Sequence, residues 1–421
     1  MIRFIDLFAG IGGMRLGFQQ ACDALGIEYQ CVISSEIDKK AIETYRLNFD
    51  EQPIGDIREI DLISKFDFML AGFPCQPFSY AGKQQGFGET RGTLFFEIER
   101  LLKKYQPQGF LLENVRGLTT HDQGRTFKTI INSLEQIGYG VNYILLNSSN
   151  FGVPQNRVRI YILGILGKKP IVTIHSDKGA TDSHTFKEQL DQLNLFADNY
   201  SVVKVKDILE ENVSMNYFLS ELFEKQLFDA VDGQFEKLHG VRLIDFRGGN
   251  SLHSWNLGIK GKCTKDECSF MNALIAHRRH HKFGNHQDGK SLTLEQIKTF
   301  FNHENIDGII NSLIAKKYLK KINEKYNPVS GNMSFEVFKF LDLESISITL
   351  TSSDSSKLGV IQNGRPRRIT PRECARLQGF PESYIIHPQD NAAYKQFGNA
   401  VSVPVIRAIL LDFLKHNKFD F

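Results

Sequence analysis

The segment AGFPCQPFS, at Ala71–Ser79, places one cysteine between two prolines directly after an apolar run. Two prolines so close together exclude a helix interior and remove two hydrogen-bond donors from a strand. We therefore expect Cys75 on a rigid loop that follows a strand within residues 66–70. A thiol held at the end of a strand suits nucleophilic chemistry. A cysteine that only packs in the interior is the plainer alternative for this segment taken alone.

A glycine-rich turn near the N-terminus forms a second candidate site. The sequence DLFAGIGG at Asp6–Gly13 follows a strand-like run and opens a helical pattern, so its backbone can approach a ligand at a helix N-terminus. Glu36 follows the next predicted strand, where an acidic side chain accepts hydrogen bonds from a ribose. Asp56, on the following connection, can accept one from an adenine amino group. Together they predict a site for an adenosine-bearing cofactor; solvated acids beside tight turns are the alternative.

The elements that must position these residues follow from a regular alternation of strand and helix patterns. Strands are expected at 4–8, 30–34, 67–70, 109–112, 140–146 and 159–163, and helices at 14–25, 39–48, 93–105 and 124–137. Such alternation predicts an α/β fold with an open, doubly wound, mostly parallel sheet. Ligands bind such sheets beyond the carboxyl ends of the strands, which is where both candidate sites fall.

The pattern changes after about residue 167, where Lys, Asp, Ser and Asn become frequent. We expect a catalytic and cofactor-binding domain over 1–168, a second, smaller domain over 169–393, and a C-terminal segment, 394–421, that returns to the first domain. Two helical patterns within about 288–340 predict either a winged-helix-like insertion or a short helical hairpin. The sequence leaves that choice open.

The composition is that of a soluble globular protein. The 421 residues are 41% hydrophobic and 24% charged, and no apolar run reaches the ~18 residues of a membrane span. Six cysteines without dense spacing, and no signal-peptide pattern, predict a reduced, cytoplasmic protein whose thiols stay free. The formal charge of +3 is too small to establish a nucleic-acid partner by itself.

Seven segments together resemble the cytosine-5 DNA methyltransferases of bacterial restriction-modification systems, and they occur in that family's order. They are DLFAGIGG (6–13), GFPCQPFS (72–79), TRGTLFFE (90–97), ENV (113–115), QNRVR (155–159), RECARLQGFP (372–381) and QFGNAVSVP (396–404). They cover about the first 165 and the last 55 residues, whereas 171–365 matches no recognition domain that we can identify. The resemblance implies a Rossmann-like, S-adenosylmethionine-dependent methyltransferase fold, with a smaller DNA target-recognition domain across a cleft.

The resemblance also implies the chemistry. A thiolate adds to carbon 6 of cytosine, carbon 5 then accepts the methyl group of S-adenosylmethionine, and S-adenosylhomocysteine is released. Cys75 corresponds to the nucleophile, and Glu113 suits a proton donor to ring nitrogen 3 if burial raises its pKa. Arg159 is expected to contact the cytosine carbonyl, while Arg157 supports the loop or a phosphate.

The cofactor contacts carry over position by position. The loop of residues 8–12 is expected under the methionine moiety, Glu36 on the ribose and Asp56 on the adenine. Ile37 departs from the family pattern, because many relatives have a bulky aromatic there that covers the adenine; a smaller apolar face should still cover it. The full expected set is Phe8, Ala9, Gly10, Gly12, Gly13, Glu36, Ile37, Asp56, Ile57, Pro74, Leu94, Asn399 and Val401.

Double-stranded DNA is the expected partner. The family flips the target base out of the duplex, and the glycine-rich loop 79–91 is expected to close over it as a lid. Base and phosphate contacts are expected from the middle domain, although a solvated charged face is the alternative for each basic stretch. The expected DNA contacts are Gln76, Ser79, Arg91, Arg242, Arg247, Arg278, Arg279, Lys282, Lys316, Lys317, Lys320 and Lys321.

A zinc site is considered and not expected. Cys263 and Cys268 have permitted zinc spacing, but no second cysteine pair follows and the histidines at 277, 280 and 281 are loosely spaced. Ordinary thiols beside a basic segment explain the pattern, so no metal is predicted.

Three other functions are weighed against DNA methylation. A branch of the family methylates tRNA, but it lacks a recognition region of about two hundred residues. A catalytically silent DNA-binding relative conflicts with the intact Cys75, Glu113, Arg157 and Arg159, and a nicotinamide-dependent oxidoreductase gives the Pro-Cys loop no role. We expect a monomer without membrane contact in the bacterial cytoplasm, associated with the nucleoid through DNA. A cognate restriction endonuclease would act without a stable complex.

Overall fold

The chain forms two compact units in a computed structural model that describes residues 1–61, 63–74, 94–175, 203–284, 290–329 and 335–419. Unit 1 comprises Met1–Glu210, Glu344–Ser355 and Pro371–Phe421, and unit 2 comprises Glu211–Leu343 and Ser356–Thr370. These limits differ from the expected 1–168, 169–393 and 394–421. Residues 371–393 join unit 1, where the Glu373 carboxylate accepts a hydrogen bond from the Glu210 amide and Arg376 donates to the Ile208 carbonyl.

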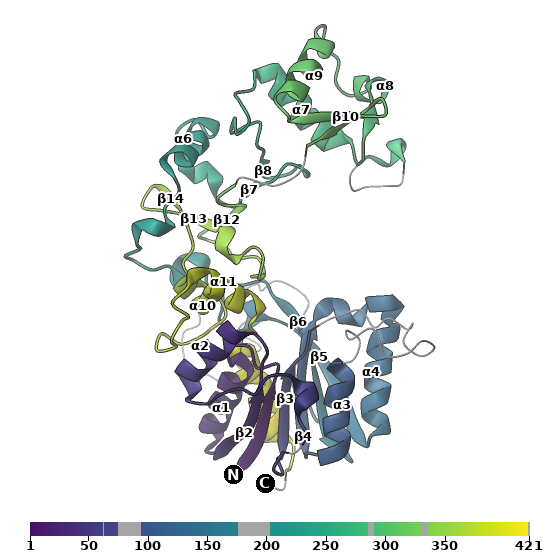
Figure 1. Cartoon of the computed structure of the whole chain (residues 1–421), viewed down its shortest axis with the longest axis vertical. Helices are drawn as coiled ribbons and strands as arrows, with labels where there is room; N and C mark the ends of the chain where they lie inside the picture. The colour runs from purple at the N-terminus through teal and green to yellow at the C-terminus, as the bar shows by residue number, and fades with distance from the viewer. Residues whose placement is uncertain (62, 75–93, 176–202, 285–289, 330–334, 420–421) are drawn as a thin grey trace. The chain divides into compact units, whose positions relative to one another are not determined.

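Unit 1 is built on a six-stranded sheet (Figure 1). Its strands are β1 (Ile2–Leu7), β2 (Tyr29–Ser35), β3 (Phe68–Gly72), β4 (Gly109–Val115), β5 (Tyr139–Asn147) and β6 (Val158–Leu166), in the order β2-β1-β3-β4-β6-β5. The strands β2, β1, β3 and β4 pair in parallel. The strand β6 runs in the opposite direction and pairs antiparallel with both β4 and β5. The predicted α/β fold with a mostly parallel, doubly wound sheet is therefore confirmed.

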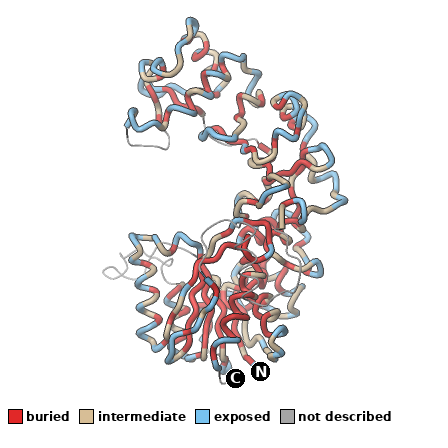
Figure 2. Tube along the Cα trace, turned by 180° about the vertical axis from the view of Figure 1, so that it is seen from behind, coloured by how far each residue is buried: buried red, intermediate tan, exposed pale blue. Residues whose placement is uncertain are grey.

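Helices cover both faces of this sheet, as its two-sided apolar strands require. On β3, Phe68 and Leu70 belong to one core cluster, and Met69 and Ala71 belong to the other. The first cluster packs under α1 and α12, and the second under α3 and α4, so the buried residues concentrate along the strands (Figure 2). The helices of unit 1 are α1 (Gly13–Leu25), α2 (Lys39–Phe49), α3 (Leu94–Tyr105), α4 (Arg125–Gln136), α10 (Pro371–Leu377), α11 (Asp390–Asn399) and α12 (Val403–His416).

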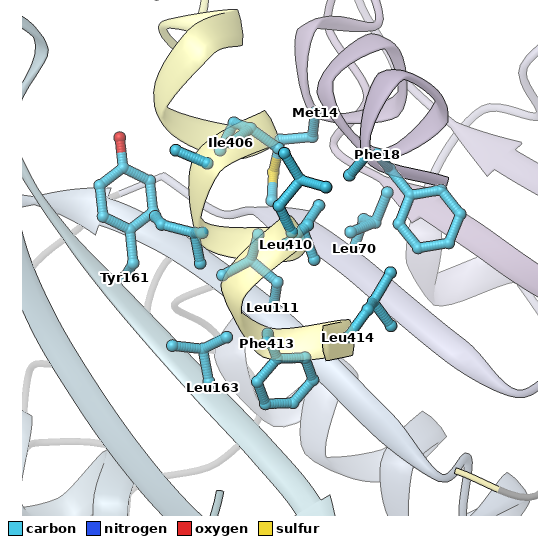
Figure 3. Close-up of a cluster of buried hydrophobic side chains, with 14 of the residues drawn as sticks. Met14, Phe18, Leu70, Leu111, Tyr161, Leu163, Ile406, Leu410, Phe413 and Leu414 are labelled. Atoms are coloured by element: carbon cyan, nitrogen blue, oxygen red, sulfur yellow. The ribbon is translucent and has the colours of Figure 1, made fainter. Parts of the chain in front are cut away.

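The C-terminal helix α12 packs beside α1 on one face of the sheet. Ile406, Leu410 and Phe413 of α12 lie in one core cluster with Phe18 of α1 and Leu70 of β3 (Figure 3). The span Asp390–His416, which holds α11 and α12, is long and apolar enough to cross a membrane, but 78% of its apolar window is buried inside the protein. Its two helices belong to the interior of unit 1.

Unit 2 contains two separate cores. One core joins α6 (Glu221–Ala230) to a five-stranded sheet of order β14-β13-β12-β7-β8. The strands of that sheet are β7 (Arg242–Leu243), β8 (Ser251–Leu252), β12 (Lys339–Phe340), β13 (Leu358–Gln362) and β14 (Arg365–Arg368). The other core joins three helices to the antiparallel sheet β10-β11-β9.

The second core includes the region around residues 288–340, where the sequence left two arrangements open. The elements run α7 (Lys265–His277), β9 (Leu292–Thr293), α8 (Leu294–Lys298), α9 (Ile306–Ala315), β10 (Leu319–Ile322) and β11 (Lys325–Pro328). A helix, a short strand, two helices and a hairpin that pairs with the short strand form a winged-helix-like arrangement rather than a helical hairpin. It begins at α7, earlier than the sequence indicated.

Close packing of α1 on α12 gives a test of the fold. A methyl group added to Gly17 would lie 2.6 Å from Cβ of Ile406 and 3.0 Å from the Val403 carbonyl oxygen, so the two helices must separate. We expect Gly17→Ala to lower the free energy of unfolding by about 1–3 kcal/mol, although alanine in a helix is ordinarily better than glycine by about 1 kcal/mol. Urea unfolding measures this.

The control is Gln20→Ala on the same helix, which should change stability by less than about 0.5 kcal/mol. A Gly17→Ala variant as stable as the parent would contradict the described contact between α1 and α12.

Candidate active site

A cavity of about 620 Å³ lies at the carboxyl ends of the parallel strands of unit 1. Its wall brings together the glycine loop after β1, the acidic residue after β2, the end of β3, the end of β4 and the turn before α12. Most of the predicted cofactor residues line it: Phe8, Ala9, Gly10, Gly13, Glu36, Ile37, Asp56, Ile57, Pro74, Leu94, Asn399 and Val401.

The glycine loop depends on backbone conformations that glycine adopts most easily. Gly10 has φ +55° and Gly12, which precedes the first turn of α1, has φ +80°. An added methyl group at Gly10 would meet no atom within 4 Å, so the backbone there is open to a ligand. At Gly12 it would lie 2.1 Å from the Phe49 ring. Gly12 therefore shapes the turn and is not part of the cavity wall.

Three backbone amides hold the Glu36 carboxylate. Gly10 donates to Oε2, and Ile37 and Asp38 both donate to Oε1, each at 2.8 Å. A carboxylate has about four acceptor positions, so one remains for a ligand hydroxyl after these three bonds. This fixed acceptor suits the predicted ribose contact.

The Asp56 carboxylate is hydrogen-bonded to Arg58, a residue that the sequence did not lead us to expect. The Arg58 guanidinium donates to both carboxylate oxygens, and the Arg58 amide donates to Oδ1 at 2.9 Å. These bonds to Arg58 hold the pKa of Asp56 below its usual range. Arg58 also lines the cavity, so an adenine amino group at Asp56 would lie beside the guanidinium. The i, i+2 spacing of an acid and an arginine was the available signal.

The apolar side of the expected adenine site combines a buried and an exposed isoleucine. Ile57 is 2% exposed, whereas Ile37 is 72% exposed and lines the cavity. An exposed isoleucine at a cavity wall has apolar surface that a flat ring can cover. That Ile37 covers the adenine stays a prediction.

The helix α11 contributes to the cavity wall and includes Lys395, a lining residue that the sequence did not lead us to expect. Its ammonium donates to Oδ2 of Asp38 at 2.8 Å, which joins α11 to the start of α2. The ion pair with Lys395 lowers the pKa of Asp38. Gln396 adds a second link, because its amide donates to the Lys40 carbonyl. The available sequence signal was the QFGN motif, which Lys395 directly precedes and Gln396 opens.

Glu113 lies at the edge where β3 and β4 end. It pairs with Gly72 on β3 and with Tyr161 on β6, and it is 8% exposed. Nε of Arg159 lies 3.2 Å from its Oε1. Burial raises the pKa of Glu113, and the charges of Arg159 and Arg157 oppose that rise. A carboxyl group in this setting is suited to hold a proton and release it to a bound base.

Arg157 acts as a buried clamp. Its guanidinium is 3% exposed and donates to the Leu350 carbonyl at 2.9 Å and to the Ala400 carbonyl at 2.7 Å. Burial lowers the pKa of Arg157 to about 9, and the nearby charge of Arg159 acts in the same direction. The bond to Ala400 ties Arg157 to the strip that supplies Asn399 and Val401 to the cavity.

The loop that carries the predicted nucleophile starts within this site. Asn114, next to Glu113, donates from its side chain to the Phe73 carbonyl at 2.9 Å and so fixes the chain just before Pro74. Four predicted residues lie outside the described part of the chain: Cys75, Gln76, Ser79 and Arg91. The structure therefore describes the support of this loop and not the loop itself.

Two of the predicted DNA contacts in unit 2 are held by other groups. Arg278 is 2% exposed, and its guanidinium donates to the Asn327 side chain and to the Phe246 carbonyl. Lys316 forms an ion pair at 2.7 Å with the buried Glu267. Both groups stabilise the interior of unit 2, because a buried charge must be paired. Neither presents a free cation to a phosphate.

The other predicted cations of unit 2 differ in their surroundings. Arg242, Lys282, Lys317, Lys320 and Lys321 are exposed, Arg279 is partly buried, and the Arg247 guanidinium lies 5.9 Å from the Phe246 ring. Cys263 and Cys268 are free thiols close enough to share a hydrogen bond. Among the described residues, no group of three or more His, Cys, Asp or Glu side chains is arranged to hold a metal ion.

Comparison with known proteins agrees with this geometry. The family described as C-5 cytosine-specific DNA methylase matches residues 2–415. The chain is 64% identical over 416 residues to the Type II methyltransferase M.BanI of Aneurinibacillus aneurinilyticus, and this alignment covers 99% of this chain and 96% of that protein. It is also 64% identical over 415 residues to the Type II methyltransferase M.HgiCI of Herpetosiphon aurantiacus, covering 99% and 98%.

Solved structures share the fold at low sequence identity. A putative DNA modification methyltransferase encoded within an Escherichia coli prophage aligns with a TM-score of 0.53 at 21% identity and covers 99% of both chains. The Dnmt2 methyltransferase of S. pombe aligns with a TM-score of 0.52 at 18% identity, again over 99% of both chains. These likenesses support the sheet and its helices.

The clamp at Arg157 can be tested by removing its donors. We expect Arg157→Met to lower the free energy of unfolding by about 2–4 kcal/mol, because buried carbonyls at Leu350 and Ala400 lose their partner. Thermal and urea unfolding measure the change. Arg46→Met, at an exposed position of α2, is the control and should change stability by less than about 0.5 kcal/mol. Equal effects of the two substitutions would contradict the clamp.

Proposed function

The chain belongs to the family of C-5 cytosine-specific DNA methylases, and from that premise we propose how its residues methylate cytosine in double-stranded DNA. The protein is a sequence-specific DNA (cytosine-5-)-methyltransferase that uses S-adenosylmethionine. One observation carries the assignment of roles: the buried acid Glu113 lies in the same cavity wall as the amide-held Glu36. A proton donor and a cofactor acceptor thus share one site.

The residues of the cavity fit S-adenosylmethionine. Glu36 keeps one acceptor position for a ribose hydroxyl, and the backbone at Gly10 is open. Ile37 offers an exposed apolar face for the adenine, with Asp56 nearby for its amino group. When bound, the cofactor supplies an electrophilic methyl group on a positively charged sulfur. The chain's own residues bind and orient the cytosine against it.

Cys75 is the proposed nucleophile. Its thiolate adds to carbon 6 of the flipped cytosine, which turns carbon 5 into an electron-rich centre. After carbon 5 has gained the methyl group, it loses its proton to a base. The carbon–sulfur bond then breaks, which restores the aromatic ring and the free cysteine. The proline frame on either side of Cys75 supports this role by limiting the directions in which the thiol can point.

Glu113 supplies the proton that this addition needs. Negative charge develops on the ring as sulfur attacks, and a neutral carboxyl group at nitrogen 3 neutralises it. Burial keeps Glu113 protonated to a higher pH than an exposed glutamate. Arg159, beside Glu113, is placed to bind the cytosine carbonyl, and Arg157 positions the strip around Asn399 through its bond to Ala400.

Unit 2 is proposed to read the DNA sequence around the target cytosine. Its size of well over one hundred residues favours a long duplex over tRNA, and the most similar relatives named above are Type II methyltransferases. We propose a monomer that works in the bacterial cytoplasm on the nucleoid. A cognate restriction endonuclease would recognise the same site without a stable complex.

The proposed function is tested by mapping the product. We expect the purified protein, incubated with S-adenosylmethionine and a long unmethylated duplex of mixed sequence, to place 5-methylcytosine at one short motif only. Base-by-base conversion sequencing gives the positions. Cys75→Ser is the control and should yield no methylation while still binding the duplex. Methylation by this variant at the parent's rate would overturn the mechanism, and methylation of tRNA alone would overturn the substrate.

The role of Glu113 is tested by an isosteric change. Glu113→Gln keeps a hydrogen-bond donor but cannot transfer a proton, so we expect the single-turnover rate to fall roughly 10²–10⁴-fold. Because the acid must be protonated, the parent's rate should decrease as pH rises through the raised pKa of Glu113, and the variant should lose that decrease.

The control is Glu97→Gln, at an i, i+3 ion pair with Arg100 on α3, which should leave the rate and its pH dependence unchanged. A Glu113→Gln variant with the parent's rate would remove Glu113 from the chemistry.

A further inference from the structure

The winged-helix-like part of unit 2 has its own interior. Trp255, Phe270, Leu274, Leu313 and Tyr318 are all at most 1% exposed and belong to one cluster that includes no residue of the five-stranded sheet. The helices α7, α8 and α9 and the strands β9, β10 and β11 all contribute residues to this cluster, and Figure 1 shows α7, α8, α9 and β10 gathered in one part of unit 2. The hairpin β10–β11 therefore belongs to a module with a core of its own.

The strands β10 and β11 form a hairpin with a tight two-residue turn and a defined register. Ile322 pairs with Lys325, Lys321 with Tyr326, and Lys320 with Asn327. The two residues of the turn, at 323 and 324, have φ +49° and +60°, the combination that matches the twist of a two-stranded ribbon. Its register therefore decides which side chains share a face.

One face of the hairpin carries Lys320, Ile322 and Lys325. Alternate residues on a strand point to the same side, and directly paired residues share a side, so these three lie together. All three are exposed, and Ile322 is exposed to 52%. Lys321 lies on the other face, where its ammonium is 5.8 Å from the Tyr326 ring.

The two faces differ in free charge. Lys321 forms an ion pair at 2.8 Å with Glu324, which neutralises it. Lys320 and Lys325 form no ion pair with any of the residues that the structure describes. The face therefore presents two unneutralised ammonium groups, each next to the exposed Ile322, and the fourth residue of the face, Asn327, is buried.

The neighbouring helix has no cation that could take this role. The exposed residues of α9 are Asp307, Asn311 and Ala315, and none of them is basic. Lys316, which follows α9, is held by Glu267. Lys282 and Lys317 are exposed single cations elsewhere on this module, whereas the hairpin carries two exposed lysines, Lys320 and Lys325, on one face.

We propose that the hairpin β10–β11 is a wing that binds the sugar–phosphate backbone of the target duplex through Lys320, Ile322 and Lys325. The two ammonium groups neutralise phosphates, and Ile322 packs against the sugars between them. This contact sets the register of unit 2 on the DNA without reading bases. The proposal rests on the proposed function, since it takes double-stranded DNA as the substrate.

The test is the salt dependence of DNA binding by the full chain. Each phosphate contact contributes about 0.9 to the slope of log affinity against log salt concentration. We expect Lys320→Ala/Lys325→Ala to bind a long duplex more weakly and to flatten this slope by about 1.8. Ile322→Ala should weaken binding without changing the slope. The rate at saturating DNA should stay at the parent's value, because none of these residues lies in the cavity.

Lys321→Ala is the matched control, one residue away on the opposite face, and should leave the slope unchanged. An unchanged slope in the double variant, or an equal change in Lys321→Ala, would overturn the proposal. Failure of the proposed function would look different, because the parent itself would then bind duplex without methylating it. Circular dichroism of the variants checks that these exposed substitutions leave the fold intact.

Discussion

The site depends on the parallel pairing of β3 with β4, in which Gly72 lies opposite Glu113. This register brings the loop that leaves β3 and the acid at the end of β4 to one edge of the sheet. The pairing of β1 with β3 and of β1 with β2 adds the glycine loop and Glu36 at the same edge. A shift by one residue would turn Glu113 to the other face and separate it from the cavity.

Burial has opposite effects on the two kinds of charge in this site. The same exclusion of water raises the pKa of Glu113 and lowers the pKa of Arg157 to about 9. Burial is tolerated because Arg159 lies beside the acid and because carbonyls of the returning chain accept from Arg157. The core between α1 and α12 holds that returning chain in place, so the chemistry at one edge depends on packing on the face below it.

Much of this architecture was predictable, because strand and helix alternation is a local property of the sequence. The glycine loop, Glu36 and Glu113 follow strands, and their place at the carboxyl edge follows from the fold class. The ion pair between Arg58 and Asp56 had a signal in its i, i+2 spacing, whereas the ion pair between Lys395 and Asp38 was not predictable, because it joins residues 357 positions apart. The sequence also could not predict which lysines of unit 2 are neutralised by an acidic side chain. Lys316, Lys320 and Lys321 look alike in the sequence, but Glu267 and Glu324 neutralise two of them.

We propose that the central step is the bond that the Cys75 thiolate forms to carbon 6 of cytosine. The most direct measurement uses a duplex with 5-fluorocytosine. A base removes the hydrogen of carbon 5 as a proton but cannot remove fluorine as F⁺, so the cysteine then cannot be eliminated. With S-adenosylmethionine present, we expect a protein–DNA complex that survives denaturation, in which peptide mass mapping finds the DNA attached to Cys75. A protein that methylates ordinary duplex but forms no such complex, or one attached at another residue, would contradict it.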